Sequence, residues 1–193
     1  MLVTVLVVGL TLTAAITDAW RHKIYNWNTY SGIVAGLAIH GLGTLLAQGD
    51  EAWSKQTRWV GWIDFTDSLL GFLACGAILL TCFVFFRVGG GDVKLMAMIG
   101  ALLGLERGIE TLLWTLVLGG AIALIVLIWR VGLWTLLSRT TRHVFNTLRL
   151  GMLSPLSEEE RQALQPKLFL APCALAAVLI VQFDLSGFLP LWQ

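Results

Sequence analysis

Long apolar runs dominate the chain. Runs at 1–17, 29–47, 68–86, 109–129 and 168–183 come near the roughly 20 residues that a helix needs to cross a bilayer. A further run, 95–105, reaches only about 17 Å at 1.5 Å per residue. A segment this short is usually buried within the protein instead of crossing lipid alone. The pattern predicts an all-α, polytopic integral membrane protein with about six transmembrane helices, the fourth of them short.

The positive charges predict the orientation. If the N-terminus lies outside and each segment crosses once, only Lys55, Arg58 and Arg107 of the 13 Lys and Arg lie outside. Cytoplasmic loops carry the excess of Lys and Arg, so the N-terminus is expected outside. The first run is interpreted as an uncleaved span because Arg21 and Lys23 follow it, whereas the basic residues of a signal peptide precede its apolar core.

Composition agrees with this class. Of the 193 residues, 57% are hydrophobic and 13% are charged, against about 25% charged in soluble domains. We therefore expect one transmembrane domain over residues 1–193, with membrane lipid as its surroundings. We also expect a cytoplasmic loop at 130–167, which contains a short amphipathic helix. No basic arm indicates nucleic-acid binding, and Cys75, Cys82 and Cys173 fall inside apolar runs as small core residues.

Two aspartates are predicted at the same membrane face. Asp18 ends the first segment, and Asp92 opens the fourth after three glycines, Gly89, Gly90 and Gly91. A carboxylate at membrane depth costs about 2.5–3.5 kcal/mol on insertion scales, so it calls for an explanation. Helix capping is one: Asp92 precedes an apolar helical run, as an N-cap does. Asp18 fits this explanation poorly, because a helix C-terminus disfavours negative charge.

An aspartyl pair explains both residues. Two carboxylates held close together do not both ionise readily, so they share one proton. The ionised group activates a water molecule, and the protonated group donates to the peptide carbonyl. Glycines beside the pair let a substrate strand or another backbone segment approach closely.

The segment from Gly89 to Leu95, GGGDVKL, resembles the G-x-G-D-x-K-L motif of the type IV prepilin peptidases. Asp18, followed by Ile24 and Asn26, resembles the family's other motif, in which an aspartate precedes I-P-N. The segment PKLFLAPCALA, from Pro166, is similar to the proline-rich entry to the family's last helix. One departure is Tyr25, where the family usually has proline.

This resemblance implies an intramembrane aspartic endopeptidase with Asp18 and Asp92 as its catalytic residues, and with neither metal nor cofactor. It implies substrate positioning by Gly89, Gly90, Gly91, Lys94, Ile24 and Asn26. The expected partners are prepilins or pseudopilins with a basic leader and a hydrophobic helix, together with the pilus assembly machinery. The expected location is the bacterial inner membrane, with the active site facing the cytoplasm. Because the chain begins at the peptidase helices, without an N-terminal methyltransferase-type region, it resembles the peptidase-only branch of Flp (tight-adherence) pilus systems.

Other interpretations stay open at this stage. Paired intramembrane carboxylates also serve in proton- or ion-coupled transporters. A membrane scaffold without catalytic activity and an archaeal preflagellin-type peptidase are further alternatives. His40, inside the second run, is expected to be neutral and hydrogen-bonded and not catalytic. Lys94 is expected to extend toward the interface, and Gly100 with Gly104 to allow close helix packing.

Overall fold

The computed structural model describes residues 1–21, 23–47, 61–86, 89–131 and 170–185. The helices in this part are α1 (Leu2–Arg21), α2 (Asn26–Ala47), α4 (Phe65–Phe86), α5 (Gly90–Val131) and α8 (Leu170–Gln182), and it contains no strand. The prediction of an all-α protein is confirmed. The short helix predicted within the 130–167 loop lies outside the described residues.

Four of the described helices, α1, α2, α4 and α5, are long and apolar enough to cross a membrane, and α8 is a shorter apolar helix of 13 residues. Large apolar side chains on these helices face outward. Val5, Val34 and Val84 are 72%, 66% and 68% exposed. Exposed apolar surface on this scale requires contact with lipid or another apolar partner. The chain is a multi-pass membrane protein.

The chain divides into two units. One is Met1–Leu116 with Phe169–Gln193, and the other is Val117–Leu168. The described part of the second unit is the end of α5, up to Val131, where Leu124, Ile125 and Trp129 are exposed. All the residues discussed below belong to the first unit.

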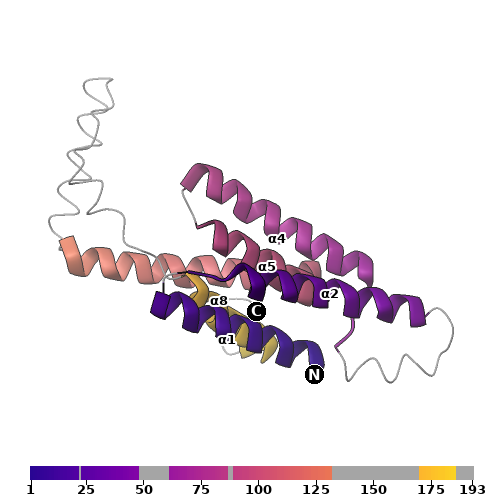
Figure 1. Ribbon diagram of the computed structural model, residues 1–193. Helices are drawn as coiled ribbons and strands as arrows, with labels where there is room; N and C mark the ends of the chain where they lie inside the picture. The colour runs from indigo at the N-terminus through magenta and orange to yellow at the C-terminus, as the bar shows by residue number, and fades with distance from the viewer. Residues whose placement is uncertain (22, 48–60, 87–88, 132–169, 186–193) are drawn as a thin grey trace. The chain divides into compact units, whose positions relative to one another are not determined.

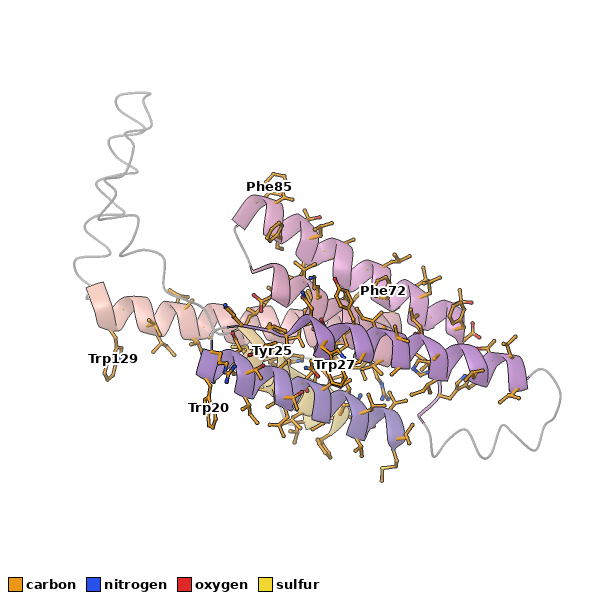
Figure 2. The ribbon with its side chains drawn as sticks, viewed as in Figure 1. Trp20, Tyr25, Trp27, Phe72, Phe85 and Trp129 are labelled. Atoms are coloured by element: carbon orange, nitrogen blue, oxygen red, sulfur yellow. The ribbon has the colours of Figure 1, made fainter. Side chains whose placement is uncertain are left out.

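In the first unit α1 packs along α8 and also contacts α2, and α2 contacts α4 (Figure 1). Val3, Val7 and Ala14 of α1 are buried at helical spacing, and small residues line the buried face of α8. Small side chains let two helices approach closely, which stabilises packing in lipid. Outward-facing side chains mark the other surface: Trp20 is 84% exposed and extends away from α1 (Figure 2).

Helix α5 turns back on itself at Gly104. This residue has φ 81° and ψ −173°, a conformation open almost only to glycine. A Cβ built on Gly108 would lie 3.1 Å from the Cα of Gly100, whereas eight residues of straight helix span about 12 Å. A short limb (residues 90–103) and the part of the following limb that belongs to the first unit (residues 105–116, the long limb) therefore lie side by side. The break separates the predicted fourth and fifth segments.

The short limb is enclosed by protein. Met98, Ile99 and Ala101 have no exposed surface, and their neighbours from Leu95 to Leu103 are all buried. Gly100 lies directly against the backbone of Gly71 in α4, because a Cβ on Gly100 would come 2.7 Å from the Gly71 carbonyl carbon. The predictions that this segment is buried in protein, and that Gly100 packs closely, are confirmed.

Helix α4 begins with a capping arrangement. The Asp64 carboxylate accepts a hydrogen bond from the Thr66 N–H at 3.3 Å and another from the Thr44 hydroxyl at 3.3 Å. The Thr44 hydroxyl oxygen in turn accepts the Phe65 N–H at 3.0 Å. A hydrogen bond from the Thr66 side chain, together with the bonds from the Thr66 N–H and the Thr44 hydroxyl, holds the pKa of Asp64 below its usual value.

Candidate active site

Asp18 lies in the last full turn of α1. The segment from Ile16 to Arg21 contains no glycine or proline, so the helix continues past Asp18 and ends at Arg21. The Asp18 side chain is half-buried. The C-terminal end of a helix disfavours a carboxylate, so helix capping does not account for this residue.

Asp92 lies in the first turn of α5. The helix begins at Gly90, and the Asp92 N–H already donates to the Gly89 carbonyl at 3.0 Å. The alternative that Asp92 is the N-cap therefore does not hold, because Gly90 and Gly91 enter the helix and the cap position falls on Gly89, three residues before the aspartate. Instead, the half-buried Asp92 carboxylate reaches back to the Gly89 N–H, as the third residue of a capping box does.

The two carboxyl groups lie close enough to interact. Asp18 is the charged residue that acts on the Asp92 carboxyl through space. The structure therefore brings together two acids from distant parts of the sequence, at one end of the helices that bear them. Neither is fully exposed, and partial burial strengthens the interaction between them. This arrangement has the components of a carboxyl pair that can hold one proton between two groups.

The three glycines before Asp92 differ in their surroundings. A Cβ on Gly89 would lie 2.8 Å from Asp92 Oδ2, and one on Gly91 would lie 3.1 Å from the Cβ of Ile24. A Cβ on Gly90 would meet only Phe83, at 3.9 Å. The crowded glycines occupy the two fixed positions of the G-x-G-D pattern, and the open one occupies its variable position. Gly89 leaves room for the carboxylate, and Gly91 leaves room for the segment that links α1 to α2.

Lys94 joins α5 to the start of α2. Its Nζ donates to Asn26 Oδ1 at 2.9 Å and lies 5.1 Å from the centre of the Tyr30 ring. The ammonium group therefore binds α2; residues two apart on a helix do not face each other, so Lys94 points away from Asp92. With Ile24 against Gly91, this bond gives the Asp18-bearing and Asp92-bearing segments a second connection.

Tyr25 stands at the N-cap position of α2. Its carbonyl accepts the N–H groups of Asn28 and Thr29 at 3.1 and 3.4 Å, and its hydroxyl accepts a hydrogen bond from Arg21 at 2.9 Å. Tyr25, where the motif it resembles has proline, thus leaves the start of α2 intact and adds a side-chain contact to the end of α1.

Sequence reasoning missed one neighbour of the pair. Cys173 of α8 is 3% exposed and lies close enough to Asp92 for an electrostatic interaction between the two side chains. From the sequence it was one of three small core cysteines, and only its place in the proline-containing entry to the last helix set it apart. Helix α8 therefore contributes to the surroundings of the carboxyl pair. Within the described ranges, no group of three or more His, Cys, Asp and Glu is arranged to hold a metal ion.

His40 lies away from the pair, as expected. It is fully buried; its Nδ1 accepts the Ile63 N–H at 3.3 Å, and its Nε2 lies 3.2 Å from the Leu102 carbonyl oxygen. A ring nitrogen that accepts an N–H carries no proton, so Nε2 is the donor and the ring is neutral. The prediction of a neutral, hydrogen-bonded histidine agrees with this geometry.

Comparison with known families decides the class. The model of the type IV leader peptidase family matches residues 5–124, which include both aspartates and all three glycines. The chain belongs to the type IV leader peptidase family. No curated protein and no solved structure matches it. Membership of a leader peptidase family supports a protease function and favours it over the transporter and scaffold interpretations.

Proposed function

We propose that this leader peptidase family member is an aspartic endopeptidase and that Asp18 and Asp92 are its catalytic pair. The observation that supports the proposal best is the meeting of these two half-buried carboxyl groups from distant parts of the sequence. The Gly89 N–H binds the Asp92 carboxylate, and the lack of a side chain at Gly89 leaves the space that this carboxylate occupies.

The proposed reaction uses the shared proton of the pair. One carboxylate removes a proton from water as the oxygen attacks the peptide carbonyl carbon. The other carboxyl group donates its proton to the carbonyl oxygen. The tetrahedral intermediate then collapses, the C–N bond breaks, and the amine leaves with a proton from the pair. Neither aspartate forms a covalent bond with the substrate.

The proposed substrates are prepilins or pseudopilins, which have a short basic leader before a hydrophobic helix. We place the reaction at the cytoplasmic face of the bacterial inner membrane, because the distribution of Lys and Arg predicts that Asp18 and Asp92 lie on that side. The predicted role is the maturation of pilins of the type IV class, with an Flp-type pilus as the specific system.

Substitution of each aspartate tests the proposal. We expect Asp18→Asn and Asp92→Asn, purified and reconstituted in liposomes, to lose at least about 10³-fold in prepilin cleavage, as pairs that act as a unit do. Glu110→Gln is the matched control, since it neutralises another half-buried carboxylate of the same unit. Cleavage by either asparagine variant at the wild-type rate would refute the assignment.

A further inference from the structure

The turn at Gly104 interrupts the hydrogen bonding of α5. In a continuous helix the Ala101 carbonyl accepts the Leu105 N–H, and the Leu102 carbonyl accepts the N–H four residues after it. The conformation of Gly104 redirects the chain at this point. Backbone groups that lose such bonds inside a membrane protein need replacement partners, because no water is present in the hydrocarbon region to supply them.

Side chains from two other helices provide those partners. The Ser68 hydroxyl of α4 donates to the Ala101 carbonyl at 2.6 Å, and His40 of α2 donates to the Leu102 carbonyl at 3.2 Å. Both side chains are fully buried. His40 is itself oriented by the Ile63 N–H, which donates to its other ring nitrogen at 3.3 Å. The C-terminal end of the short limb is thus held by directed hydrogen bonds.

A third side chain holds the start of the long limb. Asp67 of α4 accepts the Leu105 N–H at 3.2 Å and lies against Gly104, where a Cβ would overlap its carboxylate. A negative charge suits the N-terminal end of a helix. Ser68, His40 and Asp67, which we call the turn clamp, bind both sides of the break.

We propose that Ser68 and His40 of the turn clamp are positioning residues for the aspartate pair. This proposal rests on the proposed function. The short limb is one helix with Asp92 near one end and the carbonyls of Ala101 and Leu102 at the other, about 14–15 Å away at 1.5 Å per residue. Apolar packing along the limb is non-directional, whereas hydrogen bonds are directed. The two bonds to Ala101 and Leu102 therefore help to define the rotation and translation of the limb from its far end, and with them the place of Asp92 opposite Asp18.

A crosslinking assay tests this without any substrate. In an Ile24→Cys/Gly91→Cys chain the two Cβ atoms lie near the separation of a disulfide, since a Cβ on Gly91 comes 3.1 Å from that of Ile24. The rate of formation of this disulfide, identified by mass spectrometry in the full-length reconstituted protein, reports the position of the Asp92 end of the limb. We expect Ser68→Ala and His40→Leu to lower the rate severalfold, and His40→Gln, which keeps a donor, to restore most of it.

The control is Thr111→Val, which removes an equally buried hydroxyl whose bond, to the Arg107 carbonyl at 2.7 Å, stays within the long limb. Equal crosslinking rates in Ser68→Ala and Thr111→Val would overturn the proposal, and Ser68→Ala decides the matter alone if His40→Leu does not fold. In the cleavage assay Ser68→Ala should lower kcat by about tenfold with KM unchanged. Failure of the proposed function would appear instead as cleavage by the Asp18→Asn and Asp92→Asn proteins, with the crosslinking result intact.

Discussion

Replacement of Gly89 by alanine moves one oxygen atom of the carboxyl pair. The new Cβ would lie 2.8 Å from Asp92 Oδ2, a separation that real Cβ atoms do not show. The Gly89 backbone is fixed by the bonds that begin α5, so the carboxylate is the group that moves. To reach the 3.4 Å at which ordinary contact begins, Oδ2 has to shift by about 0.6 Å.

This displacement should reduce catalysis much more than stability. A misplacement of about 1 Å in a reacting group costs on the order of 10²-fold in rate, so a shift of about 0.6 Å predicts a loss of about tenfold in kcat. Alanine in place of glycine at a helix start costs less than about 1 kcal/mol in unfolding free energy. The melting temperature should therefore change little.

Gly90→Ala is the matched control, one residue away. Its Cβ would meet only Phe83, at the ordinary distance of 3.9 Å, and alanine inside a helix is favoured over glycine by about 0.5–1 kcal/mol. We expect this variant to cleave prepilin at the wild-type rate and to melt at the same or a higher temperature. Both variants are measured by cleavage of a purified prepilin in liposomes, with thermal unfolding of the same samples.

Two outcomes would refute this reasoning. A Gly89→Ala protein with wild-type kcat would show that the exact position of Oδ2 does not matter for cleavage. Equal losses in the Gly89 and Gly90 variants would show that the glycines act through backbone flexibility and not through the space beside the carboxylate.

Further predictions concern the break, the link between α5 and α2, and acid stability. Gly104→Ala should destabilise the protein by about 1–3 kcal/mol, because its backbone conformation is strained for any other residue; Gly9→Ala, which meets no atom within 4 Å, should leave the melting temperature unchanged. A double-mutant cycle of Lys94→Met and Asn26→Ala should give a coupling of about 0.5–1.5 kcal/mol in unfolding free energy, and an effect on KM alone would mean that Lys94 binds substrate instead. The hydrogen bonds at the start of α4 lower the pKa of Asp64. The stabilisation by these bonds should be fully present above the unfolded carboxyl pKa, near pH 4, and should be lost as the pH falls through the lower pKa of the folded protein. The melting temperature of Asp64→Asn should therefore change less with pH over this range than that of the wild type.

The sequence predicted the elements whose determinants are local. The run at 95–105 is too short to cross lipid, and the structure buries all of it except Leu105, with Met98 and Ile99 at 0% exposure. The lengths of the apolar runs likewise predicted the helices α1, α2 and α4 to within a few residues. Length and hydropathy are properties of one segment, so they can be judged without knowledge of its neighbours.

Features that depend on contacts between segments were predicted poorly. The capping role of Asp92 stayed open at the level of the sequence, because nothing local shows that Gly90 and Gly91 lie in the first turn of α5. The turn clamp was missed, although Ser68 and His40 are polar residues within or at the edge of apolar runs. Each of them binds a carbonyl that is free only because Gly104 breaks a helix elsewhere in the chain. No local pattern contains that information.

The two aspartates lie on helical segments of different kinds, and this difference explains why the short limb is held by side-chain hydrogen bonds at both ends. Asp18 lies on a helix of membrane-spanning length, whereas Asp92 lies on a limb enclosed by protein. Contact with lipid can set the depth of α1 through its exposed apolar face, but it cannot set that of the short limb. The limb is instead fixed at both ends by the protein: by Lys94 on Asn26 beside the pair, and by Ser68 at the turn. Asn26 follows Asp18 after one short linker. The bond from Lys94 to Asn26 therefore ties the Asp92 end of the limb directly to the segment that bears Asp18.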